Sequence, residues 1–241
     1  MSYIFTSESV SGGHPDKVCD QISDAVLDAY LAEDPNSRVA CETMIKNNMV
    51  FIAGEITSLG SPDLEPVVRK TINDIGYNAD EYGFNGDTCE FTNLVFEQSP
   101  DISQGVTEGE GENLEQGAGD QGIMFGYATN DTKELMPAAV HYAHRLGQAL
   151  TQLRKDRTHT WLRPDSKTQV SIEYIDNKPN RFTSVVISTM HAKEISTQEI
   201  RDVLTRDLIE KHLPGNLLTP ETEILINPTG LFVVGGPEGD A

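Results

Sequence analysis

The order of the predicted helices and strands constrains the fold of this chain more than any other feature of its sequence. In the first half, helical spacing of apolar residues alternates with strand-like patterns in the order β-α-β-β-α-β. The predicted elements are strand 3–6, helix 15–32, strands 38–45 and 49–56, helix 66–75 and strand 88–96. The two central strands form a hairpin, because the Asn47-Asn48 pair between them tolerates the positive φ angles of a two-residue turn.

The second half of the sequence repeats this order. The predicted elements are strand 123–129, helix 137–154, strands 168–174 and 181–189, helix 197–213 and strand 223–226. Ser196 and Glu199 form a capping box at the start of the last helix. The repeated order predicts an α+β protein of two similar units, 1–97 and 117–230, each a sheet with helices on one face.

Two segments fall outside these units. Residues 98–116 combine glycines and acidic residues without periodicity, and a loop of this length in a compact chain is typically a lid or a linker. We expect this loop to be mobile. Residues 231–234 resemble the opening strand of a third unit and run into a glycine-rich turn. We therefore expect residues 231–241 to be the stub of a truncated third unit and the chain to be incomplete at its C-terminus.

The acidic composition excludes several classes of function. The sequence has 38 Asp and Glu against 18 Lys and Arg, a formal net charge of -20, which argues against binding to nucleic acid or to an anionic membrane. No apolar run approaches the roughly 18 residues of a membrane-spanning helix, and the N-terminus lacks a signal-peptide pattern. The three widely spaced cysteines fit neither a disulfide framework nor a zinc site, so we expect a cytoplasmic protein.

The start of the first predicted helix is a candidate phosphate-binding site. Pro15 at the first helical position makes His14 the N-cap, and the free N–H groups of a helix start favour a phosphate. His14 can donate to a phosphate oxygen, and Asp16 can hold a cation bound to that phosphate. The alternative is an ordinary surface cap in which Asp16 only complements the helix dipole.

Glu42 and Glu55 form a second candidate group. With Asn47-Asn48 as a two-residue turn, Glu42 faces Ala53 and Glu55 faces Ala40 across the hairpin. The two carboxylates are then diagonal neighbours on one sheet face, roughly 7–8 Å apart between Cα atoms. Two carboxylates beside small residues favour a metal ion or a substrate ammonium, and the alternative is a solvent-facing strand surface. A three-residue turn would place them on opposite faces.

Two further motifs carry less information. Residues 117–122 match the G-x-G-x-x-G pattern, but an acidic loop precedes them and a predicted strand follows, which excludes a dinucleotide-binding turn. Residues 161–167 are interpreted as a polar loop that enters a strand. Asp165 and Lys167 in this loop are candidates for binding a ribose and a phosphate, although an ordinary loop has the same pattern.

Together these stretches resemble the methionine adenosyltransferases, which form S-adenosylmethionine from ATP and methionine and release phosphate and diphosphate. The resemblance covers essentially the whole chain. It rests on residues 5–10, 13–17, 20–25, 54–57, 98–102, 117–122, 125–129, 162–165, 227–230 and 235–237. It implies a fold of three similar β-α-β-β-α-β units, in agreement with the repeated order of elements.

The resemblance also implies a role for each matching residue. His14 and Lys167 are expected to act in catalysis, Asp16 to hold Mg²⁺ and Glu42 to hold K⁺. The ATP-binding residues implied are His14, Asp165, Ser166, Lys167, Phe232 and Asp240. The methionine-binding residues implied are Glu55, Gln98, Asp120 and Asp240. The segment from Gln98 onward would be a mobile loop over the active site, and the full-length enzyme would be a homodimer or a homotetramer.

The sequence departs from the family pattern in two places. Leu231 stands where the family usually has an arginine, so one cationic contact is lost. The third unit, which carries the cationic residues that hold triphosphate, is missing, and the net charge of -20 agrees with that absence. We therefore expect this chain to be inactive alone. The alternatives are a naturally short, non-catalytic subunit that assembles with a full-length partner, and a free-standing nucleotide-binding module.

Overall fold

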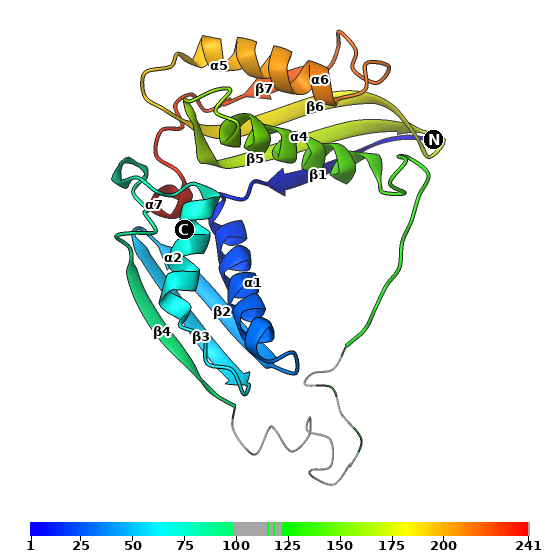
Figure 1. Ribbon diagram of the computed structural model, residues 1–241. Coiled ribbons are helices and arrows are strands. Elements are labelled where there is room, and N and C mark those ends of the chain that lie inside the picture. Colours follow the sequence, from blue (N-terminus) through cyan, green and yellow to red (C-terminus); the bar gives the residue numbers. More distant parts are fainter. Residues whose placement is uncertain (99–114, 116–117, 119–121, 241) are drawn as a thin grey trace.

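A computed structural model describes residues 1–98, 115, 118 and 122–240 of the chain. The described residues form two sheets, each with its own helices and its own hydrophobic core (Figure 1). The α+β class predicted from the sequence is confirmed. The short segment between the first strand and the first helix connects the two sheets, so the geometry of this connection decides which side chains meet there.

The smaller sheet has three strands in the order β2-β3-β4. Strands β2 (Arg38–Lys46) and β3 (Met49–Thr57) are antiparallel, and β4 (Glu90–Glu97) runs parallel to β3. Helices α1 (Pro15–Glu33) and α2 (Leu64–Ile75) cover one face of this sheet (Figure 1). The helices bury Val18, Ile22, Val68 and Ile72 against Val50 and Ile52. Helix α2 begins two residues before the predicted start at Pro66, and a short 3₁₀ turn, η1 (Asp80–Tyr82), precedes β4.

The larger sheet has four strands in the order β1-β5-β6-β7. Its strands are β1 (Ser2–Val10), β5 (Leu162–Ile175), β6 (Lys178–His191) and β7 (Glu223–Ile226). Only the β6–β7 pair is parallel. Its helices are α4 (Ala138–Lys155), α5 (Thr197–Leu204), the π-helical turn η2 (Thr205–Ile209) and α6 (Glu210–His212). Their core includes Leu146, Ile172, Phe182 and Ile200, all fully buried.

The first strand lies in a different sheet from the one predicted. The sequence places residues 3–6 in the first unit, beside the 38–56 hairpin. In the structure, β1 pairs along its whole length with β5, from Ser2 opposite Ile175 to Val10 opposite Lys167. The chain therefore begins in the larger sheet and crosses to α1 through residues 11–14. As a result, residue 97 does not mark a boundary between the two sheets.

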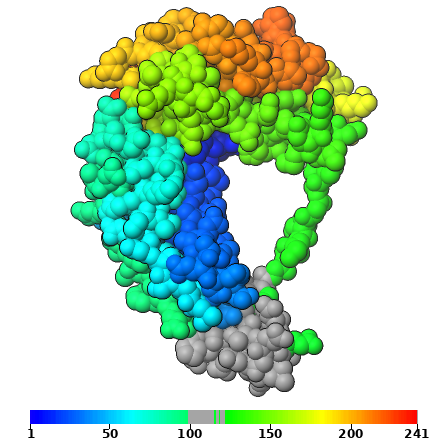
Figure 2. Space-filling model, in the orientation of Figure 1, coloured from blue at the N-terminus to red at the C-terminus, as the bar shows by residue number. Residues whose placement is uncertain are grey.

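Three local predictions are wrong. Residues 123–129 form no strand, and the side chains of Ile123, Met124 and Phe125 are 81–94% exposed. Figure 2 shows this green segment, which precedes α4, standing clear of α1. Residues 231–234 also form no strand and lead into the short helix α7 (Gly236–Gly239). The segment 162–167, predicted as a loop, is the start of β5.

The two strands predicted at residues 123–129 and 231–234 are absent for the same physical reason. Alternation of apolar residues indicates an extended backbone, but a strand also needs a partner for its hydrogen bonds. The fourth strand of the larger sheet comes from β1 instead of residues 123–129.

The predicted mobile loop 98–116 lies outside the described residues, apart from Gln98 and Glu115. Within the described ranges, none of the helices is both long and apolar enough to cross a membrane.

The core of the larger sheet yields a stability prediction. Ile172→Ala removes a fully buried side chain and should lower the free energy of unfolding by about 2–5 kcal/mol, because a cavity replaces packed atoms. The matched control is Ile4→Ala, on the neighbouring strand with a side chain that is 61% exposed, which should cost less than about 0.5 kcal/mol. Urea unfolding of both variants measures the difference. Equal losses would contradict this assignment of the core.

Candidate active site

The site begins at the loop that joins β1 to α1. The Ser11 hydroxyl donates to the Pro164 carbonyl at 2.9 Å and accepts from the Ser166 N–H at 3.0 Å. The Ser11 N–H also donates to the Ser166 carbonyl at 2.9 Å. Gly13 allows a close approach here, since a Cβ at this position would lie 2.3 Å from the Pro164 carbonyl oxygen. The start of α1 is therefore held directly against the first residues of β5.

His14 is the N-cap of α1, as predicted, and its side chain is buried. The Asp16 N–H donates to His14 Nδ1 at 3.2 Å, which leaves the proton of a neutral imidazole on Nε2. Nε2 lies 3.0 Å from Asp240 Oδ2, although without the alignment of a hydrogen bond. The cap thus presents one imidazole N–H toward the C-terminal end of α7. Asp16 in the first turn also complements the helix dipole, as the ordinary-cap alternative expects.

Asp165 is the most unusual carboxylate in the site, since it is only 2% exposed. Its Oδ2 accepts a hydrogen bond from the Gly236 N–H at 2.7 Å, and its Oδ1 is buried without a partner among the described residues. Burial raises the pKa of this carboxyl, whereas the Gly236 hydrogen bond and the nearby His14 act in the opposite direction. An orphaned buried acceptor of this kind favours a ligand that donates a hydrogen bond, such as a ribose hydroxyl.

Lys167, Asp240 and Phe232 complete this group. Lys167 Nζ lies 3.8 Å from Asp240 Oδ2, and both side chains are about half exposed. A Cβ on Gly235 would meet the Phe232 ring at 2.5 Å and Asp165 Oδ2 at 3.1 Å, so the ring lies close to the buried carboxylate. Four separate segments of the chain therefore supply a cation, an imidazole, two carboxylates and an aromatic ring. This set is suited to an anionic, ribose-containing ligand.

Asp16 lies at the open edge of the group. Its side chain is 89% exposed, and its Oδ2 is 3.8 Å from His14 Nδ1. In the described part of the chain no three His, Cys, Asp or Glu side chains converge as a ready-made metal site. One exposed carboxylate is nevertheless compatible with Mg²⁺, which commonly takes one or two carboxylates together with substrate phosphates and water.

Glu42, Glu55 and Gln98 lie on the smaller sheet and form a second group. The predicted register is confirmed, with Glu42 opposite Ala53, Glu55 opposite Ala40 and a two-residue turn. Both carboxylates lie on the face of the sheet away from α1 and α2, and both are exposed. Gln98 continues β4, and its Oε1 accepts from the Thr57 hydroxyl at 3.3 Å. None of the contacts described among these residues joins this group to His14.

Large apolar side chains surround the second group on the same sheet face. Met44, Leu94 and Phe96 are 43–66% exposed, and Met49 is 49% exposed. An exposed apolar surface of this kind on a sheet is typical of an interface rather than of a solvent-facing strand surface. The remaining predicted methionine ligand, Asp120, lies outside the described residues.

Sequence reasoning missed two residues that shape the site. The Tyr77 hydroxyl donates to the Gly13 carbonyl at 2.5 Å, and its buried ring leaves no room for a side chain at Gly236. His191 accepts from the Phe232 N–H through Nε2 at 3.1 Å, and the His191 N–H donates to the Phe232 carbonyl at 2.9 Å. A lone Tyr and a lone His carry no local signal, because their partners are 41 to 64 positions away in the sequence.

Comparison with known proteins gives matches along nearly the whole chain. The profile for the N-terminal domain of S-adenosylmethionine synthetase matches residues 2–100, and the profile for the central domain matches residues 115–232. An S-adenosylmethionine synthase of Sorangium cellulosum is 57% identical over 239 residues, which are 99% of this chain and 57% of that protein. One from Nitratidesulfovibrio vulgaris is 56% identical over 238 residues, which are 99% of this chain and 61% of that protein. The chain thus spans about three fifths of the length of these curated relatives.

The buried Asp165 predicts a dependence of stability on pH. A raised pKa means that the folded state binds this proton more tightly than the unfolded chain, so the contribution of Asp165 to stability declines as pH rises from 3.8 through the raised value. Asp165→Asn removes this decline and keeps an oxygen that accepts from Gly236. The stability of the variant relative to the native chain should therefore increase with pH, by about 1.4 kcal/mol per unit of raised pKa. Urea unfolding between pH 4 and pH 8 measures it, and a pH-independent difference would contradict it.

Proposed function

Because the chain belongs to the S-adenosylmethionine synthetase family, we propose that it forms the ATP-binding part of an enzyme that makes S-adenosylmethionine from ATP and methionine. The observation that supports this most directly is the convergence of His14, Asp165, Lys167 and Asp240 at the start of α1. These residues are far apart in the sequence, and each matches a position that the family resemblance assigns to ATP.

The proposed reaction explains why the group holds no strong base. The methionine sulfur is already nucleophilic, so it attacks C5′ of ATP directly, the S–C5′ bond forms, and the C5′–O bond breaks with its electron pair going to triphosphate. The protein must align the two reactants and stabilise the negative charge that develops on the leaving group. His14 Nε2–H and Lys167 Nζ would be the donors to the phosphate chain. Triphosphate is then hydrolysed to phosphate and diphosphate.

Two metal ions are part of the proposal. Asp16, exposed beside His14, would hold Mg²⁺ together with phosphate oxygens. Glu42, on the open face of the smaller sheet, would hold K⁺. Bound Mg²⁺ would supply positive charge for the triphosphate leaving group. The ribose would bind at Asp165 and Ser166, and the base would bind near Phe232. Leu231 beside Phe232 is exposed, and it replaces the arginine that is usual in the family.

The separation of the two groups supports assembly of more than one subunit. Methionine would bind through Glu55, Gln98 and Asp120, yet Glu55 and Gln98 have no described contact with the His14 group. The apolar side chains around Glu42 and Glu55 are exposed together on one sheet face, which is a character of interfaces. We propose a homodimer or homotetramer in which this face of one subunit meets a second subunit and completes the site. A cytoplasmic location stays a prediction.

ATP binding provides the test of the proposed nucleotide site. Lys167→Gln should weaken Mg²⁺–ATP binding about tenfold, because it removes a charge-assisted hydrogen bond. The matched control is Lys178→Gln, an exposed lysine at the other end of the same β5–β6 hairpin, which should leave the affinity unchanged. Isothermal titration calorimetry measures both. Native affinity in Lys167→Gln would contradict the proposal, whereas binding without S-adenosylmethionine formation in any assembly would favour the non-catalytic alternative.

The two glutamates of the smaller sheet allow a second test in catalytically active enzyme. Glu55→Gln should chiefly raise the KM for methionine, because it removes the charge opposite the substrate ammonium and preserves the shape. Glu42→Gln should leave the methionine KM near normal and reduce the activation by K⁺. Steady-state kinetics with methionine and K⁺ varied separate these effects. If both variants retain the native methionine KM and K⁺ response, the proposed roles are wrong.

A further inference from the structure

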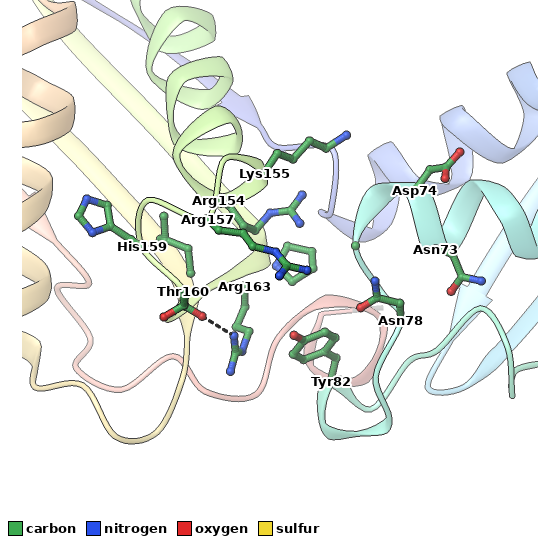
Figure 3. Close-up of a pocket in the computed structure, with 13 residues that line it drawn as sticks. Asn73, Asp74, Asn78, Tyr82, Arg154, Lys155, Arg157, His159, Thr160 and Arg163 are labelled. Atoms are coloured by element: carbon green, nitrogen blue, oxygen red, sulfur yellow. Dashed lines mark hydrogen bonds between the residues drawn. The ribbon is translucent and has the colours of Figure 1, made fainter.

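A cavity of about 580 Å³ lies between the C-terminal ends of α2 and α4, and none of the residues assigned to the substrates lines it. Figure 3 shows it with the basic side chains of the α4 end on one side and Asn73, Asp74 and Tyr82 on the other. Its basic lining residues are Arg154, Lys155, Arg157, His159 and Arg163. Four of the chain's 18 Lys and Arg residues therefore line one cavity of a protein whose net charge is -20.

Some of these charges already have partners. Arg163 pairs with Glu81 at 3.1 Å and stacks 5.1 Å from the centre of the Tyr82 ring. His159 Nε2 lies 3.2 Å from Asp207. The only carboxylate that lines the cavity in the described part of the chain, Asp74, is paired with Lys70. These three carboxylates therefore each have a basic partner already.

The other three cations have no carboxylate partner among the described residues. Arg154 donates to the Ile75 carbonyl at 2.6 Å, and its half-buried guanidinium has several further N–H groups. Burial lowers the pKa of this guanidinium, as expected for a charge without a counterion. Lys155 and Arg157 make no side-chain hydrogen bond or ion pair in the described structure. Figure 3 draws Arg154 and Arg157 among the residues that line the cavity.

Arg157 has a backbone conformation that is unusual for an arginine. The Arg157 N–H donates to the Arg154 carbonyl at 3.0 Å and the Thr158 N–H to the Leu153 carbonyl at 3.1 Å, the two bonds of a Schellman motif. Arg157 occupies the left-handed position of this motif, with φ 55°, where glycine is favoured. An arginine here carries a conformational cost of roughly 1–2 kcal/mol, so the position favours a role for its charge.

Helix dipoles alone do not account for this arrangement. Basic residues in the last turn of a helix normally complement its negative end, and the ends of α2 and α4 meet here. Each helix end is equivalent to roughly half an elementary charge, so two ends offset about one of the three unpaired cations. Guanidinium groups match the oxygens of phosphate in a bidentate geometry, and lysine adds a point charge.

We propose that this cavity is a second anion site, which takes a phosphate-class oxyanion through Arg154, Lys155 and Arg157. The ligand is either inorganic phosphate or diphosphate, or the terminal phosphate of a nucleotide. The site is separate from the His14 group and does not depend on the proposed activity. It gives this acidic chain a local attraction for small anions that its net charge would otherwise repel.

The test is a titration of the chain with inorganic phosphate, diphosphate and adenosine monophosphate at constant ionic strength, followed by amide NMR shifts. Saturable shifts should appear at residues 76–82 and 154–163. Arg157→Gly should weaken binding about tenfold while leaving the urea midpoint equal or higher, because glycine is favoured at this backbone position. Lys155→Gln should weaken binding similarly and serves as a second variant at an exposed position. Relative affinities for the three ligands distinguish free from nucleotide-borne phosphate.

Two controls make the result decisive. Lys193→Gln removes an exposed lysine outside the cavity and should leave these shifts and the affinity unchanged. His14→Asn, which alters the candidate active site, should also leave them unchanged. The proposal is overturned if the shifts do not saturate, if Arg157→Gly and Lys155→Gln bind as the native chain does, or if Lys193→Gln weakens binding equally.

Discussion

The pairing of β1 with β5 is the interaction on which the rest of this structure depends. Nine residue pairs join the N-terminal strand to a strand more than 150 positions away, in the sheet opposite to the one that α1 covers. Because Val10 is paired with Lys167, the next residues of the chain, Ser11 to His14, lie directly beside Asp165 and Ser166. The candidate ATP site exists only because this strand crosses between the two sheets.

Two closely packed glycines stabilise the segment in which the chain crosses from the larger sheet to α1. Gly13 lies against Pro164 and Gly236 lies against Tyr77, with no room for a side chain at either position. The Tyr77 hydroxyl bonds to the Gly13 carbonyl, so one buried ring contacts both the start of α1 and the start of α7. His14 and Asp240 are thereby brought within 3.0 Å of each other. A rigid backbone of this kind reduces the reorganisation needed when a charged ligand binds.

The distribution of charge follows from the same arrangement. The chain is strongly acidic overall, yet cations are concentrated at the start of β5 and at the end of α4. A site for triphosphate needs more positive charge than Lys167 and His14 provide, which is why Mg²⁺ enters the proposed function. Glu42 and Glu55 carry the opposite charge, and in the proposed function each binds a cation on the exposed face of the smaller sheet.

The sequence alone determined the features that depend on local contacts. Pro15 and His14 specify the start of α1, and Asn47-Asn48 specifies the hairpin register that places Glu42 and Glu55 on one face, because both depend on neighbours within a few residues. The family resemblance supplied the roles of the site residues but not their positions. Only the tertiary structure decided that β1 joins the larger sheet, that residues 123–129 form no strand, and that Tyr77 and His191 support the site. Strand pairing and buried hydrogen bonds join residues tens to hundreds of positions apart, and no local pattern records which partner a strand or a side chain will meet.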